Sequence, residues 1–584
     1  MTDQIVVAPV LVALVTAIVA LLARFDGHVE KGVSLAGATA YLVATIAVFD
    51  RVVLSGGGTT LTYGVSNWNA PFGIALVADS LSAFMLALAG PVVLAAAVYS
   101  VVYVGEEGQL LSYHPLFHFM VAGVSGAFLT GDVFNLFVWF EVMLMSSYVL
   151  VLFYSGREHT RAALGYVVLN LLASALMLVA IGGLYATTGT LNMADMARRL
   201  ADPAAYGVAL APTLGLGSLL LAVFAVKAGI VPFHFWVPSA YRAAPAPVTA
   251  VLAGVVKKVG VYAIIRLFFT VFGGAAYVNG STFGYVGPVL VLLACASIVY
   301  GGIGAVGRED VDGLLAFSSI GQVGFIALPL GVAMAVPSAT TTLAGAETTV
   351  AVLGVAAALV YSFNHALAKP ALFLASGTLH SAVGTTDFAR LGGLARRAPI
   401  LATGFLLGGL SLVGVPPLIG FFGKLLVFRT VAEGVAVGVP AGWLVAVTML
   451  AGAILTIAYI TRGWNAIFWG EASETVATVI PERWGRSRYT GEGNAIADGG
   501  PSVVTDRALV VQVTVVVVLA VALVGFGIGA EFVVDAATDA AQAATDTTGY
   551  VEAVDPVDPG TDYGGGDGSS GGSHSLDAFD GGEL

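Results

Sequence analysis

The chain has 584 residues, of which 58% are hydrophobic and only 10% are charged, and its formal net charge is −12. Soluble domains contain roughly 25% charged residues, so a soluble fold of this composition would lack the side chains to cover its surface. A cytosolic enzyme, a nucleic-acid-binding protein and a disordered scaffold are therefore excluded. The apolar residues form runs of about 18 to 25, the length that crosses a bilayer as a helix, which predicts an all-α polytopic membrane protein.

Common cofactor and metal motifs are missing from the sequence. The single cysteine, Cys295, lies inside an apolar run and excludes an internal disulfide or a Cys-ligated cluster. There is no Walker or HExxH pattern, so we expect no cofactor, no metal and no ATP. The first apolar run follows Asp3 without a basic segment, so we expect a membrane span there and not a cleaved signal peptide.

About fourteen transmembrane spans are predicted from the apolar runs. Residues 471–507 are polar and contain Pro and Gly, which favours a cytoplasmic loop. The approximate limits of the spans are 5–24, 33–54, 74–104, 110–131, 133–155, 161–187, 213–237, 248–272, 284–305, 313–335, 348–377, 399–430, 440–468 and 508–530.

The acidic excess lies at the C-terminus. Residues 531–584 contain twelve acids and no Lys or Arg, so they supply the whole net charge. This tail is rich in Gly, Ser and Asp and is predicted to be disordered. Acidic excess with only six lysines favours a halophilic source, and GC-rich codon usage is the alternative.

Basic residues in the loops predict the orientation. We define side A as the side of the membrane that holds the N-terminus and side B as the opposite side. Loops on side B hold fourteen Lys or Arg, against five on side A (Arg51, Arg198, Arg199, Arg266 and Arg429). Cytoplasmic loops carry the excess of Lys and Arg, so side B is predicted to be cytoplasmic and both termini extracellular, in a multi-pass protein of the cell membrane.

Two of the predicted spans contain prolines that break a helix. The seventh has Pro232 shortly after Lys227, and the twelfth has Pro416 and Pro417 before Lys424. Membranes tolerate such breaks mainly where the freed backbone groups are buried in protein or hydrated. The reversed order of lysine and proline fits two inverted repeats, a common transporter plan.

Ionisable residues inside the spans are the candidate functional groups. Each costs roughly 2.5–3.5 kcal/mol at the bilayer centre, so they must be paired or hydrated within the bundle. Buried Lys and Glu also change protonation state readily, which favours a proton relay over the alternative of fixed ion pairs between helices. The candidates are Glu141, Lys227, one of Lys257 and Lys258, His365, Lys369 and Lys424.

Other polar residues are open to two interpretations. His365 and Lys369 are four residues apart on one helix face, so we expect them to share a single charge unless they only make a polar helix contact. His234 is either a cap or interface residue or a relay member. Asp79 and Asp132 lie near membrane borders, which favours structural roles. Two roles are open for Ser318, Ser319 and Gln322: these side chains either order water or pack helices together.

Six segments together resemble one family. Residues 130–142 (TGDVFNLFVWFEV) resemble the fifth helix of the D-type subunit of Mrp-type multisubunit cation/proton antiporters. The seventh and eighth helices of the same superfamily are similar to KAGIVPFHFWVP at 227–238, APAP at 244–247 and KVGVYA at 258–263. Its eleventh and twelfth helices are similar to NHALAKPALFL at 364–374 and PPLIGFFGK at 416–424. The superfamily includes antiporter-like subunits of respiratory complex I and of membrane-bound hydrogenases, and the resemblance covers roughly residues 75 to 470.

This resemblance implies roles for single residues. Glu141 and Lys227 would form the functional pair of a first half-channel, and Lys258 would connect it to the second. His365 and Lys369 would continue the polar axis, and Lys424 would be the lysine of the broken twelfth helix. Lys257 stands where the family has a small or apolar residue, so either adjacent lysine can face the axis. Asp312 and Gly313 replace a basic pair, which leaves a cytoplasmic contact open.

The resemblance also implies a function and a domain order. The chain would be the proton-conducting subunit of an antiporter that exchanges protons against Na⁺, with other antiporter subunits as partners, and not an enzyme. The alternatives are a proton-translocating subunit of a complex I-like oxidoreductase or hydrogenase, and a non-conducting assembly scaffold. The expected units are N-terminal helices in 1–104, half-channels in 105–272 and 273–470, the loop 471–507, the last helix 508–530 and the tail 531–584.

Overall fold

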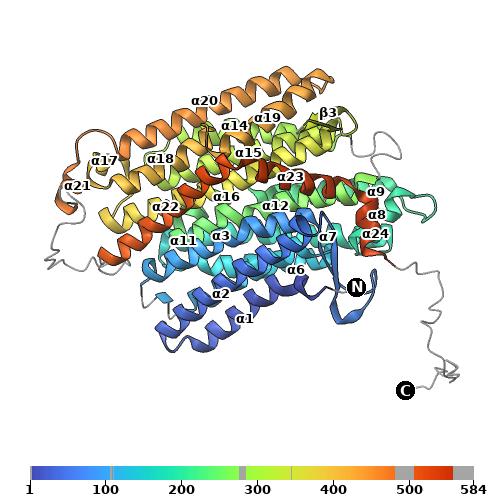
Figure 1. The fold of residues 1–584 in the computed structure, drawn as a ribbon, viewed down its shortest axis with the longest axis horizontal. Coiled ribbons are helices and arrows are strands. Elements are labelled where there is room, and N and C mark those ends of the chain that lie inside the picture. Colours follow the sequence, from blue (N-terminus) through green and yellow to red (C-terminus); the bar gives the residue numbers. More distant parts are fainter. Residues whose placement is uncertain are drawn as a thin grey trace.

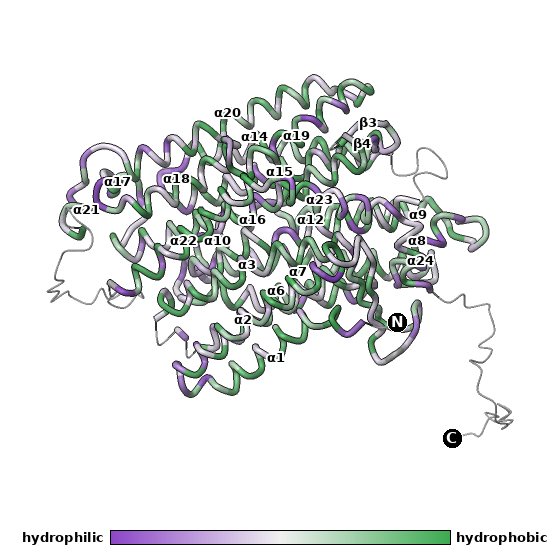
Figure 2. The backbone as a smooth tube through the Cα atoms, in the orientation of Figure 1, coloured by the Kyte–Doolittle hydropathy of each residue, from purple (hydrophilic) through white to green (hydrophobic). Residues whose placement is uncertain are grey.

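The computed structural model describes residues 3–105, 108–109, 111–274, 284–343, 345–480 and 506–556. Its long helices run side by side along one common direction (Figure 1). Twelve helices in the described ranges are long and apolar enough to cross a membrane. Hydrophobic residues follow the outer helices α1 and α20, while hydrophilic residues gather toward the ends of the bundle, near α17 and α21 and near α8 (Figure 2). The predicted all-α polytopic membrane fold is confirmed.

The N-terminal third consists of long helices and one antiparallel hairpin, in which Leu61 of β1 lies opposite Ala78 of β2. Its elements are η1 (Gln4–Val7), α1 (Ala8–Ala23), α2 (Gly27–Phe49), the π-helical turn η2 (Asp50–Leu54), β1 (Leu61–Gly64), η3 (Val65–Asn67), β2 (Ala75–Ala78), α3 (Ser80–Tyr103), α5 (Tyr113–Leu129), α6 (Val133–Val151) and α7 (Arg157–Thr188).

The middle of the chain is divided into shorter helical pieces. Its elements are α8 (Met193–Ala201), α9 (Leu210–Ala228), α10 (Trp236–Ala243), α11 (Ala246–Val251), the π-helical turn η4 (Leu252–Val256), α12 (Lys257–Ile265) and the π-helical turn η5 (Arg266–Val271).

The C-terminal half returns to long helices, with a second hairpin in which Thr340 pairs with Thr349. Its elements are α14 (Val286–Val306), α15 (Val311–Ala335), β3 (Thr340–Leu343), β4 (Ala346–Thr349), α16 (Val350–Val383), η6 (Phe388–Arg390), α17 (Leu394–Arg397), α18 (Pro399–Val413), α19 (Ile419–Ala436), α20 (Gly442–Ile467), α21 (Glu474–Val479), α22 (Asp506–Ile528), α23 (Ala530–Thr545) and α24 (Thr547–Val554).

All fourteen predicted spans correspond to helices. Two of them fall outside the twelve long apolar helices: α5 has 17 residues, and the twelfth span is divided into α18 and α19. The seventh span is also divided, into α9 and α10. Both predicted breaks are therefore present. The predicted loop 471–507 contains the short helix α21, and its residues 481–505 lie outside the described residues.

Aspartates begin several of the long helices. Asp79 accepts a hydrogen bond from the backbone N–H of Ser82 at 2.9 Å, and Asp132 accepts one from the N–H of Asn135 at 2.7 Å. Such N-caps satisfy backbone donors that have no partner within the helix. The structural roles expected for both aspartates agree with these positions.

The two described ends of the chain lie on the same side of the bundle (Figure 1). The backbone N–H of Asp3 donates to the carbonyl of Thr62 at 3.1 Å, and Arg198 Nη1 donates to the carbonyl of Pro556 at 3.0 Å. The N-terminus, the first hairpin, α8 and α24 therefore share side A.

The prediction of a disordered tail was wrong for residues 531–554, which belong to the helices α23 and α24. α23 buries Val533 and six alanines at helical spacing and packs against α16 and α3. Its Asp535 lies on the exposed face. Average composition hid this amphipathic pattern, which is enough to form a packed helix. Residues 557–584 lie outside the described residues.

Arg266 was expected in a loop on side A, and this expectation was wrong. Its side chain is 1% exposed and makes two hydrogen bonds of 2.7 Å to the carboxylate of Asp79. The ring of Tyr550, from α24, lies 4.9 Å from the guanidinium. This buried pair therefore joins α3, η5 and the C-terminal helix on side A.

Arg266→Met should lower the free energy of unfolding by about 3–5 kcal/mol, because it leaves the charge of Asp79 buried without a partner. Thermal unfolding of the purified protein in detergent measures the change. Arg51→Met is the matched control, because Arg51 pairs with Asp3 at 3.6 Å while 61% exposed. Exposed pairs contribute about 0–1 kcal/mol, so equal losses in the two variants would contradict the structural role of the buried pair.

Candidate functional site

All five lysines predicted inside the membrane are buried. Lys227 and Lys424 are 4% exposed, and the three others are 0% exposed. Each ammonium donates to a backbone carbonyl: Lys227 to Asn170, Lys257 to Ser319, Lys258 to Ala253, Lys369 to Leu315 and Lys424 to Val413. All the ion pairs among the described residues use arginine instead. The buried lysines are thus held by neutral acceptors, which do not fix their charge.

Glu141 and Lys227 meet through a third side chain. Ser174, on α7, donates its hydroxyl proton to Glu141 Oε1 and accepts a hydrogen bond of 2.8 Å from Lys227 Nζ. Lys227 Nζ also donates to the carbonyl of Asn170 at 3.2 Å. Glu141 and Lys227 form no direct ion pair, so their expected pairing is corrected to a pairing through Ser174.

Ser174 was missed by the sequence analysis. Asn170 and Ser174 stand four residues apart in the apolar run of α7, so they lie on one helix face. This polar pair was the feature of the sequence from which a role for Ser174 could have been predicted. Ser and Asn are common in membrane helices as packing residues, so the signal identifies a function only once Glu141 and Lys227 are placed beside it.

The break between α9 and α10 lies directly after Lys227. Ser297 accepts a hydrogen bond of 2.9 Å from the backbone N–H of Val231, and Trp236 Nε1 donates to the carbonyl of Val226 at 2.8 Å. Gly229 has a φ of +69°, and a Cβ there would lie 3.2 Å from Cε of Lys257. The freed backbone groups are therefore satisfied, and the glycine lets Lys257 approach the break.

Both adjacent lysines of the eighth span point into the protein. Lys258 Nζ lies 2.6 Å from His365 Nδ1 and 2.8 Å from the carbonyl of Ala253, which belongs to the π-helical turn η4. Lys257 Nζ lies 3.4 Å from the carbonyl of Ser319 on α15. π-helical turns occur often at functional sites. Lys258 therefore contacts α16, while Lys257 lies between the break after α9 and α15.

His365 and Lys369 contact different helices. His365 faces Lys258, whereas Lys369 Nζ donates to Ser318 Oγ at 2.5 Å and to the carbonyl of Leu315 at 2.8 Å, both on α15. No hydrogen bond joins His365 to Lys369 in the described structure. The expected sharing of one charge between them thus has no direct contact to support it.

Polar side chains near Lys369 form a network across three helices. Gln322 Nε2 donates to the hydroxyl of Tyr459 at 2.6 Å and to Thr456 Oγ1 at 3.3 Å, and Tyr361 donates to Gln322 Oε1. Gln322 thus binds side chains of α16 and α20. Tyr361 and Tyr459 were not singled out in the sequence, because aromatic residues in apolar runs are usually packing residues.

Lys424 lies beside the second break. Its Nζ donates to the carbonyl of Val413, the last residue of α18, at 3.0 Å, and lies 5.0 Å from the centre of the Phe325 ring. Gly414 follows with a φ of +91°. The lysine therefore binds a carbonyl that the break has freed.

His234 packs among aromatic rings. Its ring centre lies 4.4 Å from that of Tyr300 and 4.5 Å from that of Phe235. Nδ1 is buried without a hydrogen-bond partner. This environment is that of an interface residue, so His234 is the less favoured member of the candidate set.

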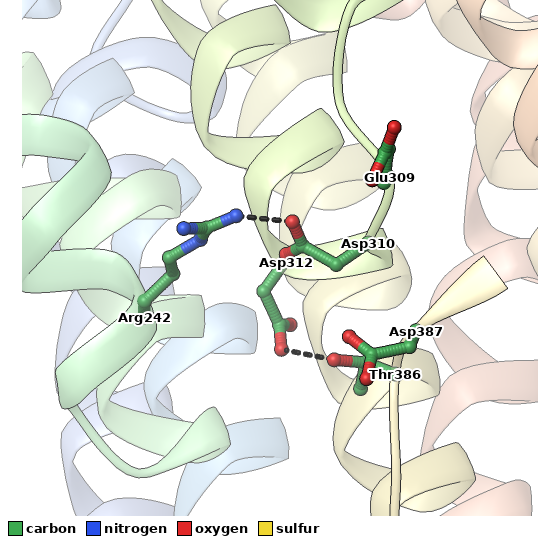
Figure 3. A pocket seen from close by; sticks show the side chains of 6 residues that line it. All are labelled: Arg242, Glu309, Asp310, Asp312, Thr386 and Asp387. Carbon is green, nitrogen blue, oxygen red and sulfur yellow. Dashed lines mark hydrogen bonds and ion pairs between the residues drawn. The ribbon is translucent and has the colours of Figure 1, made fainter. Parts of the chain in front are cut away.

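An acidic cavity of about 440 Å³ lies on side B, next to these helices (Figure 3). Arg242 of α10 pairs with Asp310, the N-cap of α15, and so joins the two halves of the chain. Asp312 accepts hydrogen bonds from Ser376 at 2.6 Å and from Thr386 at 3.1 Å. Asp312, which stands in place of a basic residue of the resembled family, therefore forms its hydrogen bonds within the chain.

Potential metal ligands are scattered over the described part of the chain. Within these ranges, no three His, Cys, Asp or Glu side chains lie together as a metal site. The candidate site consists instead of hydrogen-bonded clusters that follow one another from α6 to α19.

Buried lysines, one partly buried glutamate and two broken helices define a class of ion-translocating membrane subunits. Residues 130–456 match the NADH:quinone oxidoreductase/Mrp antiporter transmembrane family, and the chain belongs to this family. It is 33% identical over 474 residues to the D-type subunit of the Na⁺/H⁺ antiporter of Alkalihalophilus pseudofirmus, which covers 81% of this chain and 88% of the relative.

Two further comparisons show the breadth of the family. The N-type subunit of the NADH-quinone oxidoreductase of Desulforudis audaxviator is 33% identical over 470 residues, covering 78% of this chain and 85% of the relative. A chain of the Mrp complex from Dietzia sp. DQ12-45-1b superimposes with a TM-score of 0.78 at 28% identity, covering 94% of this chain and 100% of that chain. The fold is therefore shared by antiporter and oxidoreductase subunits.

Lys257→Met should leave the free energy of unfolding unchanged or raise it by up to about 4 kcal/mol, because an apolar side chain of similar size removes a buried charge. Lys257 suits this test because its one hydrogen bond, of 3.4 Å to a carbonyl, is weak. Thermal unfolding in detergent measures the change, with the partly exposed Lys31→Met as control. A loss of several kcal/mol in Lys257→Met alone would show that this lysine stabilises the fold.

Proposed function

We propose that this chain is the proton-conducting subunit of a multisubunit Na⁺/H⁺ antiporter. In this subunit, protons move from Glu141 along the buried lysines and His365 to Lys424. One observation carries the proposal: the buried lysines are held by neutral acceptors, and the nearest carboxylate reaches Lys227 only through a hydroxyl. Such groups are free to change protonation state. The chemistry is ion transfer without a covalent step, so the chain is a transporter subunit and not an enzyme.

The first half of the relay begins at Glu141. A proton that arrives there neutralises the carboxylate, so the hydroxyl of Ser174 no longer donates to an anion. The attraction that keeps Lys227 protonated then weakens, because opposite charges interact strongly in a low-dielectric interior. Lys227 releases its proton toward Lys257 and Lys258, which lie on the far side of the break.

The second half runs from Lys258 to Lys424. Because Lys258 donates to Nδ1 of His365, a neutral imidazole carries its own proton on Nε2. The proton next reaches Lys369, which is bonded to the hydroxyl of Ser318. The network around Gln322 and Lys424 completes the path at the second broken helix.

The partner subunits and the location of the chain follow from its family membership. The Mrp relatives are named as subunits, so we assign this chain to a hetero-oligomeric complex in the cell membrane that exchanges protons against Na⁺. Large apolar side chains remain exposed on the outer helices, including Leu22, Leu178 and Trp443. Lipid and neighbouring subunits would cover them.

The alternative is a proton-translocating subunit of a redox-driven complex, since an N-type oxidoreductase subunit is equally similar over most of the chain. Na⁺-dependent proton exchange by the purified complex in vesicles, without an electron donor, separates the two functions. A non-conducting scaffold would support exchange whatever the charge at Lys227.

Lys227→Arg tests the relay most directly. Guanidinium does not release its proton in the physiological range, so exchange should fall by about a hundredfold or more, as when a proton-transfer group is lost. Glu141→Gln and Lys227→Ala should fail similarly while the complex still assembles. Sodium-dependent collapse of a pH gradient in inverted vesicles is the measurement. If Lys227→Arg transports like the wild type while Lys227→Ala does not, the cluster is structural.

The orientation is tested by labelling with an impermeant maleimide. In a variant without Cys295, a cysteine introduced by Thr59→Cys, on exposed side A, should react in intact cells. The matched position is Glu158→Cys, exposed on side B, which should react only after lysis. The reverse pattern would place side A in the cytoplasm.

A further inference from the structure

Three buried titratable residues lie outside the relay, on the N-terminal helices. Glu30 of α2 and His114 and His118 of α5 are all 0% exposed. Both carboxylate oxygens of Glu30, both ring nitrogens of His114 and Nδ1 of His118 have no hydrogen-bond partner. Buried polar groups in native proteins nearly always have partners, often ordered water. Five unpartnered atoms on neighbouring helices therefore indicate a hydrated site.

These residues begin a polar seam between α2 and α5. Ser34 Oγ lies 2.9 Å from Nε2 of His118, and Ser125 donates to the hydroxyl of Tyr41 at 2.9 Å. The two bonded pairs have the same sequence separation of 84 residues, so the helices run in parallel. Glu30 and His114 continue the same register one turn earlier, because residues four apart share a helix face.

The seam extends from side B to the depth of the relay. Both helices begin on side B, so Glu30 and His114 lie near that surface and Tyr41 and Ser125 lie deep in the bundle.

On the other face of α5, a Cβ at Gly123 would lie 2.5 Å from the backbone of Met143, and a Cβ at Gly126 would lie 2.1 Å from the ring of Trp139. Met143 and Trp139 flank Glu141 on α6. The inner end of the seam is therefore level with Glu141, one helix away.

The charged surroundings of the seam are few. Lys31 of α2 is the charged neighbour of both Glu30 and His114. Of the elements packed on α2, α1 and α3 contain no Asp, Glu, His, Lys or Arg, and the turn η2 at the side A end of α2 contains Asp50 and Arg51. The elements packed on α5 add Glu141 of α6 and Lys257 and Lys258 of α12. Within the described ranges, no ion pair or hydrogen bond joins an arginine to Glu30, His114 or His118.

We propose that Glu30, His114 and His118 form a hydrated proton-binding site that takes up protons from side B and supplies the relay at Glu141. Imidazole exchanges protons readily near neutral pH, and a buried carboxyl group changes protonation state more readily there than an exposed one. Water between the unpartnered atoms connects them, and the hydroxyls of Ser34, Tyr41 and Ser125 extend the path inward. This inference rests on the proposed function, because it requires a relay that begins at Glu141.

Carbodiimide labelling tests proton binding without measuring transport. Dicyclohexylcarbodiimide partitions into membranes and reacts with carboxyl groups that carry a proton. Peptide mass spectrometry of the intact complex should find Glu30 modified, and the modification should decline as the pH is raised. Absence of the adduct on Glu30 at every pH at which the complex is intact would overturn the proposal.

Transport by the complex tests the supply of protons. Glu30→Gln and His118→Gln should each slow Na⁺-dependent collapse of a pH gradient by about tenfold, because a lost proton-transfer group costs at least this much. His28→Gln is the matched control, since His28 lies on α2 but is exposed, and it should transport like the wild type. Ser34→Ala, which removes the one partner of His118, is a milder variant should the others fail to assemble.

The outcomes separate this inference from the proposed function. If Glu141→Gln is inactive while Glu30→Gln, His118→Gln and Ser34→Ala transport like the wild type, the relay stands and the seam is only a structural polar cluster. If Glu141→Gln transports normally, the proposed function itself fails. Equal losses in His28→Gln and His118→Gln would also refute a specific role for the buried seam.

Discussion

Burial of a lysine ammonium inside a membrane is the constraint on which the rest of the structure depends. A charge at that depth needs an acceptor, and each buried lysine finds one in a backbone carbonyl. The broken helices and the π-helical turn provide carbonyls, as Val413 does for Lys424 and Ala253 for Lys258. Irregular backbone thus supplies the acceptors of these two lysines, while Lys227, Lys257 and Lys369 bind carbonyls of α7 and α15.

Arginine and lysine are used for different purposes in this chain. Arg266 with Asp79 on side A and Arg242 with Asp310 on side B are permanent ion pairs that join separate parts of the chain at the two ends of the bundle. The interior holds lysines with neutral partners. Because guanidinium stays charged while an amine can lose its proton, the ends of the bundle are electrostatically fixed and its centre is free to titrate.

The hydroxyl of Ser174 sets the strength of the interaction between Glu141 and Lys227. A direct contact between Glu141 and Lys227 would stabilise both charges and hold the proton in place. With one hydroxyl between them, the carboxylate still attracts the ammonium, but more weakly, since the energy falls with distance. In the second half Lys369 donates to the hydroxyl of Ser318, so a serine on the neighbouring helix accompanies a lysine in each half of the chain, although Ser318 donates to the carbonyl of Leu315 and not to a carboxylate.

The sequence by itself determined the membrane fold, the two breaks and the buried lysines, because span length, proline and charge act locally along the chain. It did not determine that Ser174 separates Glu141 from Lys227, that His365 and Lys369 face different helices, or that Arg266 finds Asp79. Those partners lie far apart in sequence, and only helix packing brings them together. The helix α23 was missed for a related reason: its alanines gain stability only when buried against α16 and α3, so the acidic composition of the tail concealed a packed element.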